Sequence, residues 1–306
     1  MEIVAGDVGQ ASGLYQRSVF NPGERQEAAA PGSGFSKRRH SIAEPGKEES
    51  EHGTGGAPHL LDVLGGSGPI RPFLAPLGVD ERGRTIWLDI CQEGSRHVLV
   101  EGEPHSARSE MVRGVAVGLA MTTRPALLQL LAIDFSGREL LVLESLPHAV
   151  IDAAAEPAAC TESLRWLAAE LEARRREGRR WPEMLLVIED LMSLAGSPCA
   201  RSRVALTEIL RIGGAWGIHV LGGVSSLTSG LRSAGWSSPD VARISADGHP
   251  GSFVFRRGAS ACPLAAIRVP AVDLDRVSRG LRRGTTETHR ASEERGPQLP
   301  VRARPV

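Results

Sequence analysis

The stretch from Gly102 to Ser109, GEPHSARS, has residue types and a spacing that could hold the phosphates of a nucleotide. It follows the form of a phosphate-binding loop, G-x-x-x-x-G-K-[ST], in which backbone N–H groups and the lysine bind phosphate and the hydroxyl binds Mg²⁺. Ser109 keeps the hydroxyl, whereas Ala107 and Arg108 replace the second glycine and the lysine. The predicted nucleotide-binding residues are Gly102, Glu103, Pro104, His105, Ser106, Ala107, Arg108 and Ser109.

Three of these residues should weaken the chemistry of the loop. Arg108 keeps a positive charge, but its planar, bulky guanidinium does not replace the compact ammonium of lysine. Ala107 adds a Cβ where the backbone must approach phosphate, and Pro104 lacks an N–H donor. Lysine is found only at Lys37 and Lys47, near the N-terminus. We therefore expect ATP and Mg²⁺ as the cofactors of this loop, with weak or absent hydrolysis.

A pair of carboxylates, Glu189 and Asp190, ends the apolar run LLVIED and could supply the metal and base chemistry. The usual order is an Asp near Mg²⁺ followed by a Glu that polarises the attacking water, and here that order is swapped. Glu189, with Ser109, is the predicted metal ligand. Asp190 is about one methylene short for a base, a misplacement that can cost roughly 100-fold. The same pair could instead cap the next helix.

Apolar runs separated by helical patterns position these motifs. The sequence predicts strands over 84–90, 97–102, 126–134, 183–190 and 217–224, and helices over 106–121, 156–176 and 203–212. Strands this apolar, alternating with helices, indicate a parallel sheet covered on both faces. The predicted fold class is therefore a three-layer α/β fold with a mostly parallel sheet. The loop would follow one strand of this sheet and open a helix, as phosphate binding requires.

Composition divides the 306-residue chain into a domain and two tails. Residues 1–70 are rich in Gly, Ser, Pro and Glu and are predicted to be a disordered tail, as are residues 285–306, which leaves a domain over 71–284. The formal net charge is zero, so a nucleic-acid contact would need a local patch. No leader or apolar run of about 20 residues is evident, which predicts a cytoplasmic chain without membrane insertion.

Several other residues carry an expectation. The four cysteines are widely separated, and the histidines lack metal-ligand spacing, so neither a metal site nor a disulfide framework is expected. The arginines of residues 174–180 are expected to form a solvated helix end. His219 should be a hydrogen-bonded core residue. Asp134 follows a strand and could lie near nucleotide or cap the next helix.

From about Arg71 to Arg283 the sequence resembles an FtsK/SpoIIIE-type ATPase domain, whose relatives include the EccC motors of type VII secretion. The resemblance is carried by the stretches PLGVDERGRTIWLDICQEGSRHVLVEG, LLAIDFSGREL, LLVIED and LTEILRIGGAWGIHVLGGVSS, in the order of that family. It implies a RecA-like P-loop NTPase fold, ATP and Mg²⁺ as cofactors, DNA as a candidate partner, and assembly into a ring with FtsK-like subunits. The chain departs from the family where residues 224–227, VSSL, replace a sensor of the γ-phosphate.

Three hypotheses follow from these features. The first is a DNA-translocating ATPase. The second is a pseudo-ATPase of the same fold that serves as a scaffold or regulatory subunit in a type VII secretion or DNA-translocation system and binds protein partners. The third is an interaction protein with a vestigial loop. The substitutions favour a domain that binds nucleotide, is a candidate for DNA binding, and hydrolyses ATP weakly or not at all.

Overall fold

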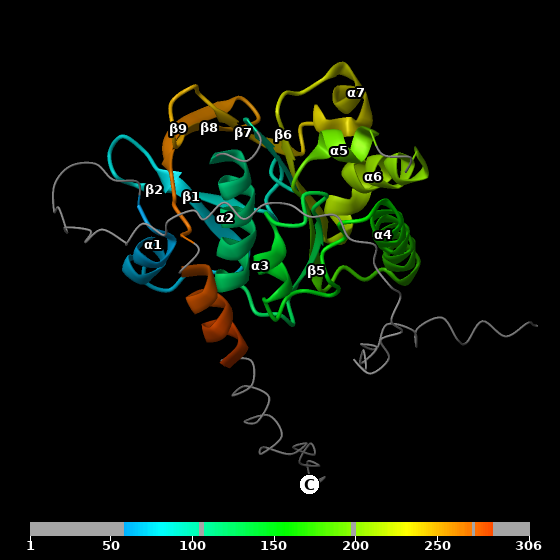
Figure 1. The fold of residues 1–306 in the computed structure, drawn as a ribbon, viewed down its shortest axis with the longest axis horizontal. Coiled ribbons are helices and arrows are strands. Elements are labelled where there is room, and N and C mark those ends of the chain that lie inside the picture. Colours follow the sequence, from blue (N-terminus) through cyan, green and yellow to red (C-terminus); the bar gives the residue numbers. More distant parts are fainter. Residues whose placement is uncertain (1–57, 104–106, 197–199, 271–272, 284–306) are drawn as a thin grey trace, which may run out of the picture. The chain divides into compact units, whose positions relative to one another are not determined.

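The computed structural model describes residues 58–103, 107–196, 200–270 and 273–283 (Figure 1). Most of the two expected tails therefore lies outside the described residues. The folded part nevertheless begins before residue 70. Leu60 opens helix α1 (Leu60–Gly66), is 1% exposed, and its N–H donates to the Arg268 carbonyl at 3.1 Å. A short amphipathic helix thus lies inside a stretch whose overall composition predicts a tail.

One sheet organises the described residues, with the strand order β2-β1-β9-β8-β7-β3-β6-β5-β4. The strands are β1 (Leu74–Val79), β2 (Thr85–Asp89), β3 (His97–Glu101), β4 (Leu128–Ile133), β5 (Glu183–Ile188), β6 (Ile218–Val224), β7 (Val241–Ala246), β8 (Ser252–Arg257) and β9 (Ser260–Ala266). Strands β7, β3, β6, β5 and β4 are parallel. The other four extend the sheet with antiparallel pairings, so the sheet is mixed.

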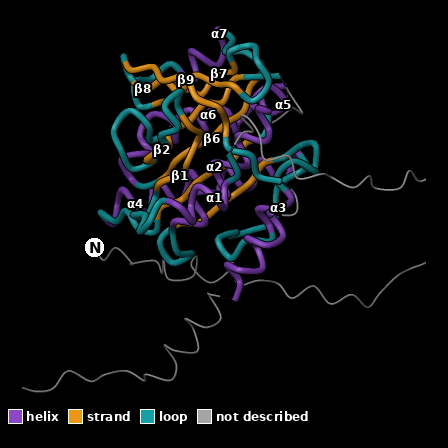
Figure 2. Tube along the Cα trace, turned by 90° about the vertical axis from the view of Figure 1, so that its left-hand side faces the viewer, coloured by secondary structure: helices purple, strands orange, loops and turns teal. Residues whose placement is uncertain are grey.

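Helices cover both faces of this sheet (Figure 2). The remaining elements are α2 (Ala107–Thr122), α3 (Leu141–Glu144), α4 (Pro157–Glu177), α5 (Leu191–Gly196), α6 (Ala200–Ile212), η1 (Gly213–Trp216), α7 (Ser229–Leu231) and η2 (Arg232–Trp236). Helices α2 and α3 pack with Val98 and Val100 in one core, whereas α4, α5 and α6 pack with Leu99 in a second. Alternate residues of β3 therefore face opposite cores, as a strand covered on both faces requires. The α/β three-layer prediction is confirmed.

The apolar runs of the sequence form the expected elements. The ranges 97–102, 183–190 and 217–224 contain β3, β5 and β6, and the helical range 106–121 contains most of α2. Every residue of β5 and β6 is buried, which explains why these strands lack an alternating polar pattern. Among the described residues, no helix combines the length and apolar composition that crossing a membrane requires.

The basic end of α4 differs from the expected solvated surface at one position. Arg174 is fully buried, and its Nη1 donates to the carbonyls of Arg180 and Trp216 at 2.6 and 2.9 Å. Its Nη2 donates to the Pro182 carbonyl at 2.6 Å, and its Nε donates to Glu170 at 2.8 Å. The prediction of a solvated arginine was therefore wrong for Arg174. This side chain instead satisfies carbonyls of the turns that precede β5 and β6.

Buried His148 makes the stability of the folded state depend on pH. Burial lowers the pKa of His148 below its ordinary value of 6.5, although a 2.7 Å contact between Nε2 and the Thr123 carbonyl partly opposes that shift. Its Nδ1 has no hydrogen-bond partner among the described residues. An unfolded chain protonates this histidine near pH 6.5, while the folded chain keeps it neutral to lower pH. Its contribution to stability is therefore present above pH 6.5 and is lost below it.

We accordingly expect His148→Gln to reduce the loss of stability that accompanies acidification from about pH 7.5 to about pH 5.5. The measurement is the urea midpoint of unfolding at several pH values for both proteins. Exposed His249 provides the matched control, because His249→Gln should leave the pH dependence unchanged. Parallel curves for the wild type and His148→Gln would contradict the assignment.

Candidate functional site

The phosphate-loop motif lies where a strand, a loop and a helix follow one another. Gly102 comes directly after β3, and its N–H donates to the Val224 carbonyl at 3.0 Å, which ties the start of the loop to the end of β6. Ala107 begins α2, so Arg108 and Ser109 lie in its first turn. Glu103 is exposed at the edge of the loop. The other predicted binding residues, Pro104, His105 and Ser106, lie outside the described residues.

Arg108, Ser109 and Glu189 meet at the first turn of α2. The Arg108 Nη2 and the Ser109 hydroxyl both donate to the same oxygen, Glu189 Oε1, at 2.7 Å each. The Arg108 side chain is fully buried and that of Glu189 is 5% exposed, so the two charges face each other away from water. The structure therefore joins the first turn of α2 to the end of β5 by a buried ion pair.

The guanidinium keeps unused donors inside the protein. Arg108 Nε and Nη1 are buried and have no hydrogen-bond partner among the described residues. A buried donor without an acceptor is costly, and native proteins usually satisfy it with water or a bound group. Arg108 therefore has donor capacity for an anion beside the loop while one nitrogen holds Glu189.

Gly223 creates the space in which these groups meet. It lies on β6, the strand between β3 and β5. A Cβ atom at this position would lie 2.2 Å from the Glu189 carbonyl oxygen and 3.3 Å from Arg108 Nε. Only glycine permits this approach. The two glycines inside the apolar run VLGGV were the sequence signal that could have identified the position, because glycine in a strand often marks a close approach.

Asp190 adopts the helix-capping role that the sequence left open. Its carboxylate accepts hydrogen bonds from the N–H groups of Met192 and Ser193 at 3.1 and 3.2 Å and from the Ser193 hydroxyl at 2.7 Å. These contacts fix the start of α5. Both carboxylate oxygens are therefore engaged by the helix that follows β5, and a role of Asp190 as a catalytic base stays a prediction.

Asp134 likewise organises a loop. It is 1% exposed, and its carboxylate accepts hydrogen bonds from the Ser136 N–H and hydroxyl at 3.0 and 2.6 Å and from the Leu140 N–H at 2.8 Å. These bonds shape the connection from β4 to α3. All three of these side-chain hydrogen bonds lie within the connection, while the N-cap residue of α3 is Leu140, and a position of Asp134 near nucleotide stays a prediction.

Magnesium fits poorly in this arrangement of side chains. Ser109 and Glu189 offer the oxygen ligands that Mg²⁺ prefers. The Glu189 oxygen that faces Ser109, however, already accepts a hydrogen bond from the Arg108 guanidinium. A divalent cation bound to both oxygens would lie against a fixed positive charge, so the guanidinium occupies the electrostatic position of the metal.

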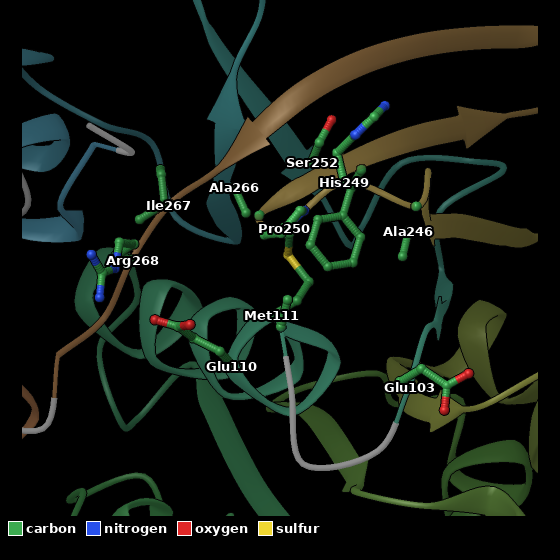
Figure 3. Close-up of a pocket in the computed structure, with 14 residues that line it drawn as sticks. Glu103, Glu110, Met111, Ala246, His249, Pro250, Ser252, Ala266, Ile267 and Arg268 are labelled. Atoms are coloured by element: carbon green, nitrogen blue, oxygen red, sulfur yellow. The ribbon is translucent and has the colours of Figure 1, made fainter. Parts of the chain in front are cut away.

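A pocket of about 650 Å³ opens beside the loop (Figure 3). Its lining consists of Glu103, Ala107, Glu110, Met111, Ala246, Gly248, His249, Pro250, Gly251, Ser252, Phe253, Ala266, Ile267 and Arg268. Figure 3 shows Met111 of α2 pointing toward the turn that carries Pro250. The volume lies within the range of about 300–1,000 Å³ that is typical of small-molecule sites. Sequence reasoning missed this pocket, because the β7–β8 turn comes close to the start of α2 only in the folded sheet.

The fold and the meeting of the two motifs define the domain as P-loop ATPase-like. Residues 70–179 match the model of the FtsK/SpoIIIE family. The DNA translocase FtsK of Lactiplantibacillus plantarum is 30% identical over 106 residues, which are 35% of this chain and 13% of the translocase. The chain thus spans a small part of that relative. These similarities identify an FtsK-type P-loop ATPase domain in this chain.

Two solved structures share the fold. The pCW3 conjugation coupling protein TcpA, in a monomer form with ATPγS, has a TM-score of 0.56 and 17% identity, over 68% of this chain and 70% of TcpA. Thermomonospora curvata EccC (ATPases 2 and 3), in complex with a signal sequence peptide, has a TM-score of 0.55 and 19% identity. That alignment covers 65% of this chain and 41% of the EccC chain. At these identities the likeness establishes the fold alone.

The buried ion pair predicts a specific stability pattern. Glu189→Gln should lower the free energy of unfolding by about 3–5 kcal/mol, because it leaves the Arg108 charge buried without its partner. Replacing both members with methionine should recover most of that loss. The measurement is urea unfolding of the single and double variants.

Glu208→Gln provides the control, because the Arg211–Glu208 pair is exposed and should contribute less than about 1 kcal/mol. Equal effects of Glu189→Gln and Glu208→Gln would contradict a buried pair in solution.

Proposed function

We propose that this domain binds ATP at the loop from Gly102 to Ser109 and hydrolyses it weakly or not at all. The observation that carries the proposal is the contact of Arg108 Nη2 and the Ser109 hydroxyl with one Glu189 oxygen, both at 2.7 Å. The contact brings the two motifs together, and it supports weak hydrolysis because the Arg108 guanidinium lies against the oxygen that would hold the metal.

The chemistry of phosphoryl transfer supports weak hydrolysis. In P-loop enzymes the metal bridges phosphate oxygens and neutralises the charge that develops in the transition state, while another residue orients the water. Arg108 competes with a metal for Glu189, and Asp190 is engaged in capping α5. ATP binding does not require a metal bridge or a catalytic base. The remaining N–H groups of Arg108 and the start of α2 can still attract phosphate.

The pocket beside the loop supports a nucleotide rather than phosphate alone. It is continuous with Glu103 and Ala107 of the loop region and includes apolar surface from Met111 and Phe253. We propose that the phosphates bind at the loop and that the base and sugar occupy this pocket. The apolar side chains would then cover the base, and polar groups at the rim would orient the sugar.

We further propose duplex DNA as a partner and assembly with FtsK-like subunits into a ring. The support is the similarity to a protein named as a DNA translocase. DNA contacts would have to come from local patches, because the formal net charge of the chain is zero. Stimulation by DNA is therefore a separate arm of the test below.

A second candidate function is a scaffold or regulatory subunit that binds protein partners instead of ATP. The observation that favours it is the complete burial of the Arg108 side chain against Glu189, which neutralises the cation of the loop from within. The similar fold of EccC, solved with a signal sequence peptide, makes a peptide segment a reasonable partner class.

Calorimetric titration of ATP into the full chain, with Mg²⁺ or with a chelator, separates these functions. We expect saturable ATP binding that changes little when the metal is removed. Arg108→Ala should weaken it about tenfold or more, because hydrogen bonds to charged groups contribute about 1.5–3 kcal/mol. Arg113→Ala is the matched control, since Arg113 lies on the same helix but pairs with Glu139. Thermal melts verify that each variant folds.

Phosphate release with and without duplex DNA completes the experiment. Slow or absent release in both conditions supports the proposal, whereas rapid release stimulated by DNA would establish a working motor and overturn it. No heat of binding at millimolar ATP would reject nucleotide binding and favour the scaffold function.

A further inference from the structure

A second cluster of reactive side chains lies at the opposite end of the sheet from the phosphate loop. Glu183 begins β5, His219 is the second residue of β6, and Cys91 lies in the connection from β2 to β3. The Glu183 and His219 side chains are fully buried, and Cys91 is partly buried. One ligand atom from each of the three residues lies within 4.8 Å of the others.

The hydrogen bonds of His219 determine which of its nitrogens is available. Its Nδ1 lies 2.7 Å from the carbonyl oxygen of Arg96, which can only accept a hydrogen bond. Nδ1 therefore carries hydrogen and donates. In the neutral imidazole the lone pair is then on Nε2, and this atom lies 2.8 Å from Glu183 Oε2. That separation is an ordinary hydrogen-bond distance, so either a proton or a metal ion bridges the two atoms.

The surroundings hold both groups in the way that metal ligands are usually held. A histidine that binds a metal typically donates its other N–H to a carbonyl or carboxylate, and a metal-binding carboxylate is itself hydrogen-bonded. The Arg96 carbonyl serves His219 in this way. For Glu183, the Arg180 Nε donates to Oε1 at 2.8 Å and leaves Oε2 facing the histidine.

The nearby backbone also accommodates the Glu183 carboxylate. Gly217 precedes β6 with a φ of 72°, and a Cβ atom there would lie 2.6 Å from Glu183 Oε2. A glycine at this turn therefore leaves open the space around the oxygen that faces His219. The same glycine also ends η1 in a left-handed conformation, so the turn accommodates the carboxylate together with the Arg180 carbonyl.

We propose that Cys91, Glu183 and His219 bind a zinc ion through Sγ, Oε2 and Nε2, with water as a fourth ligand. Sulfur, imidazole and carboxylate together are a ligand set that zinc accepts. The ion would tie the connection between β2 and β3 to the starts of β5 and β6. The site is independent of the function proposed for the phosphate loop.

The involvement of Cys91 would distinguish a bound metal ion from a proton shared between His219 and Glu183. A proton between His219 and Glu183 satisfies those two residues and needs no sulfur, whereas zinc recruits all three. Burial raises the pKa of the Cys91 thiol to about 12, so the ion must displace a proton from sulfur, as zinc does when it coordinates a thiol. The Arg180 guanidinium partly opposes that rise in the pKa of the thiol, and because its side chain is 36% exposed, water screens its charge.

The test loads metal-free full chain with Zn²⁺ or Co²⁺, removes loosely bound metal by dialysis, and measures metal by mass spectrometry. We expect about one tightly bound ion per chain, a thiolate-to-cobalt absorption band with Co²⁺, and a rise in melting temperature with Zn²⁺. Cys91→Ser should abolish the band and weaken zinc binding at least about tenfold, since even the outer partners of metal ligands contribute 10–100-fold.

Cys262→Ser is the matched control, because Cys262 is a partly buried cysteine outside the cluster. It should behave like the wild type. Zinc bound equally by Cys91→Ser and the wild type would assign the ion to other residues and overturn the proposal. No tightly bound metal in the wild type would show that a proton alone joins His219 and Glu183.

Discussion

The structure of the candidate site depends on one constraint, the need to neutralise a buried guanidinium. Arg108 lies in the first turn of α2 with its side chain fully buried, and an unpaired buried charge costs several kcal/mol. Glu189 supplies the counter-charge across β6, and Gly223 leaves room for the approach. The swapped acidic order then has a physical basis, because the longer glutamate reaches the arginine while Asp190 caps α5. The arginine at the lysine position of the loop and the reversed order of the acidic pair are therefore structurally linked through one ion pair.

The sequence predicted the sheet and its helices because their signals are local. Apolar runs such as the one that forms β5 are buried on both faces, and the order of strand, loop and helix at Gly102 followed from consecutive residues. Whether an individual charged side chain is buried or exposed was not predictable from such local signals. Arg174 resembled a surface residue in a basic run, yet it is buried because carbonyls from the turns before β5 and β6 converge on it.

The candidate site was predictable only where its residues are consecutive. The sequence identified the loop and the acidic pair, but it did not pair Arg108 with Glu189, which are 81 positions apart. The pocket was missed for the same reason, since Phe253 and Met111 line one pocket only through the antiparallel extension of the sheet. Widely spaced cysteines and histidines gave no metal signal, although folding brings Cys91 close to His219.

A buried glutamate lies at each end of the parallel strands, and the two differ in the groups that neutralise their carboxylate oxygens. At the carboxyl end, the Glu189 oxygen receives an internal cation from Arg108, so the oxygens there have little need of a metal. At the amino end, the Arg180 Nε donates to Glu183 Oε1, and Glu183 Oε2 lies 2.8 Å from His219 Nε2. A proton or a metal ion bridges that contact. The carboxyl end therefore carries a positive charge of the chain itself beside the acidic oxygen, whereas the amino end presents the three side chains of the proposed zinc site.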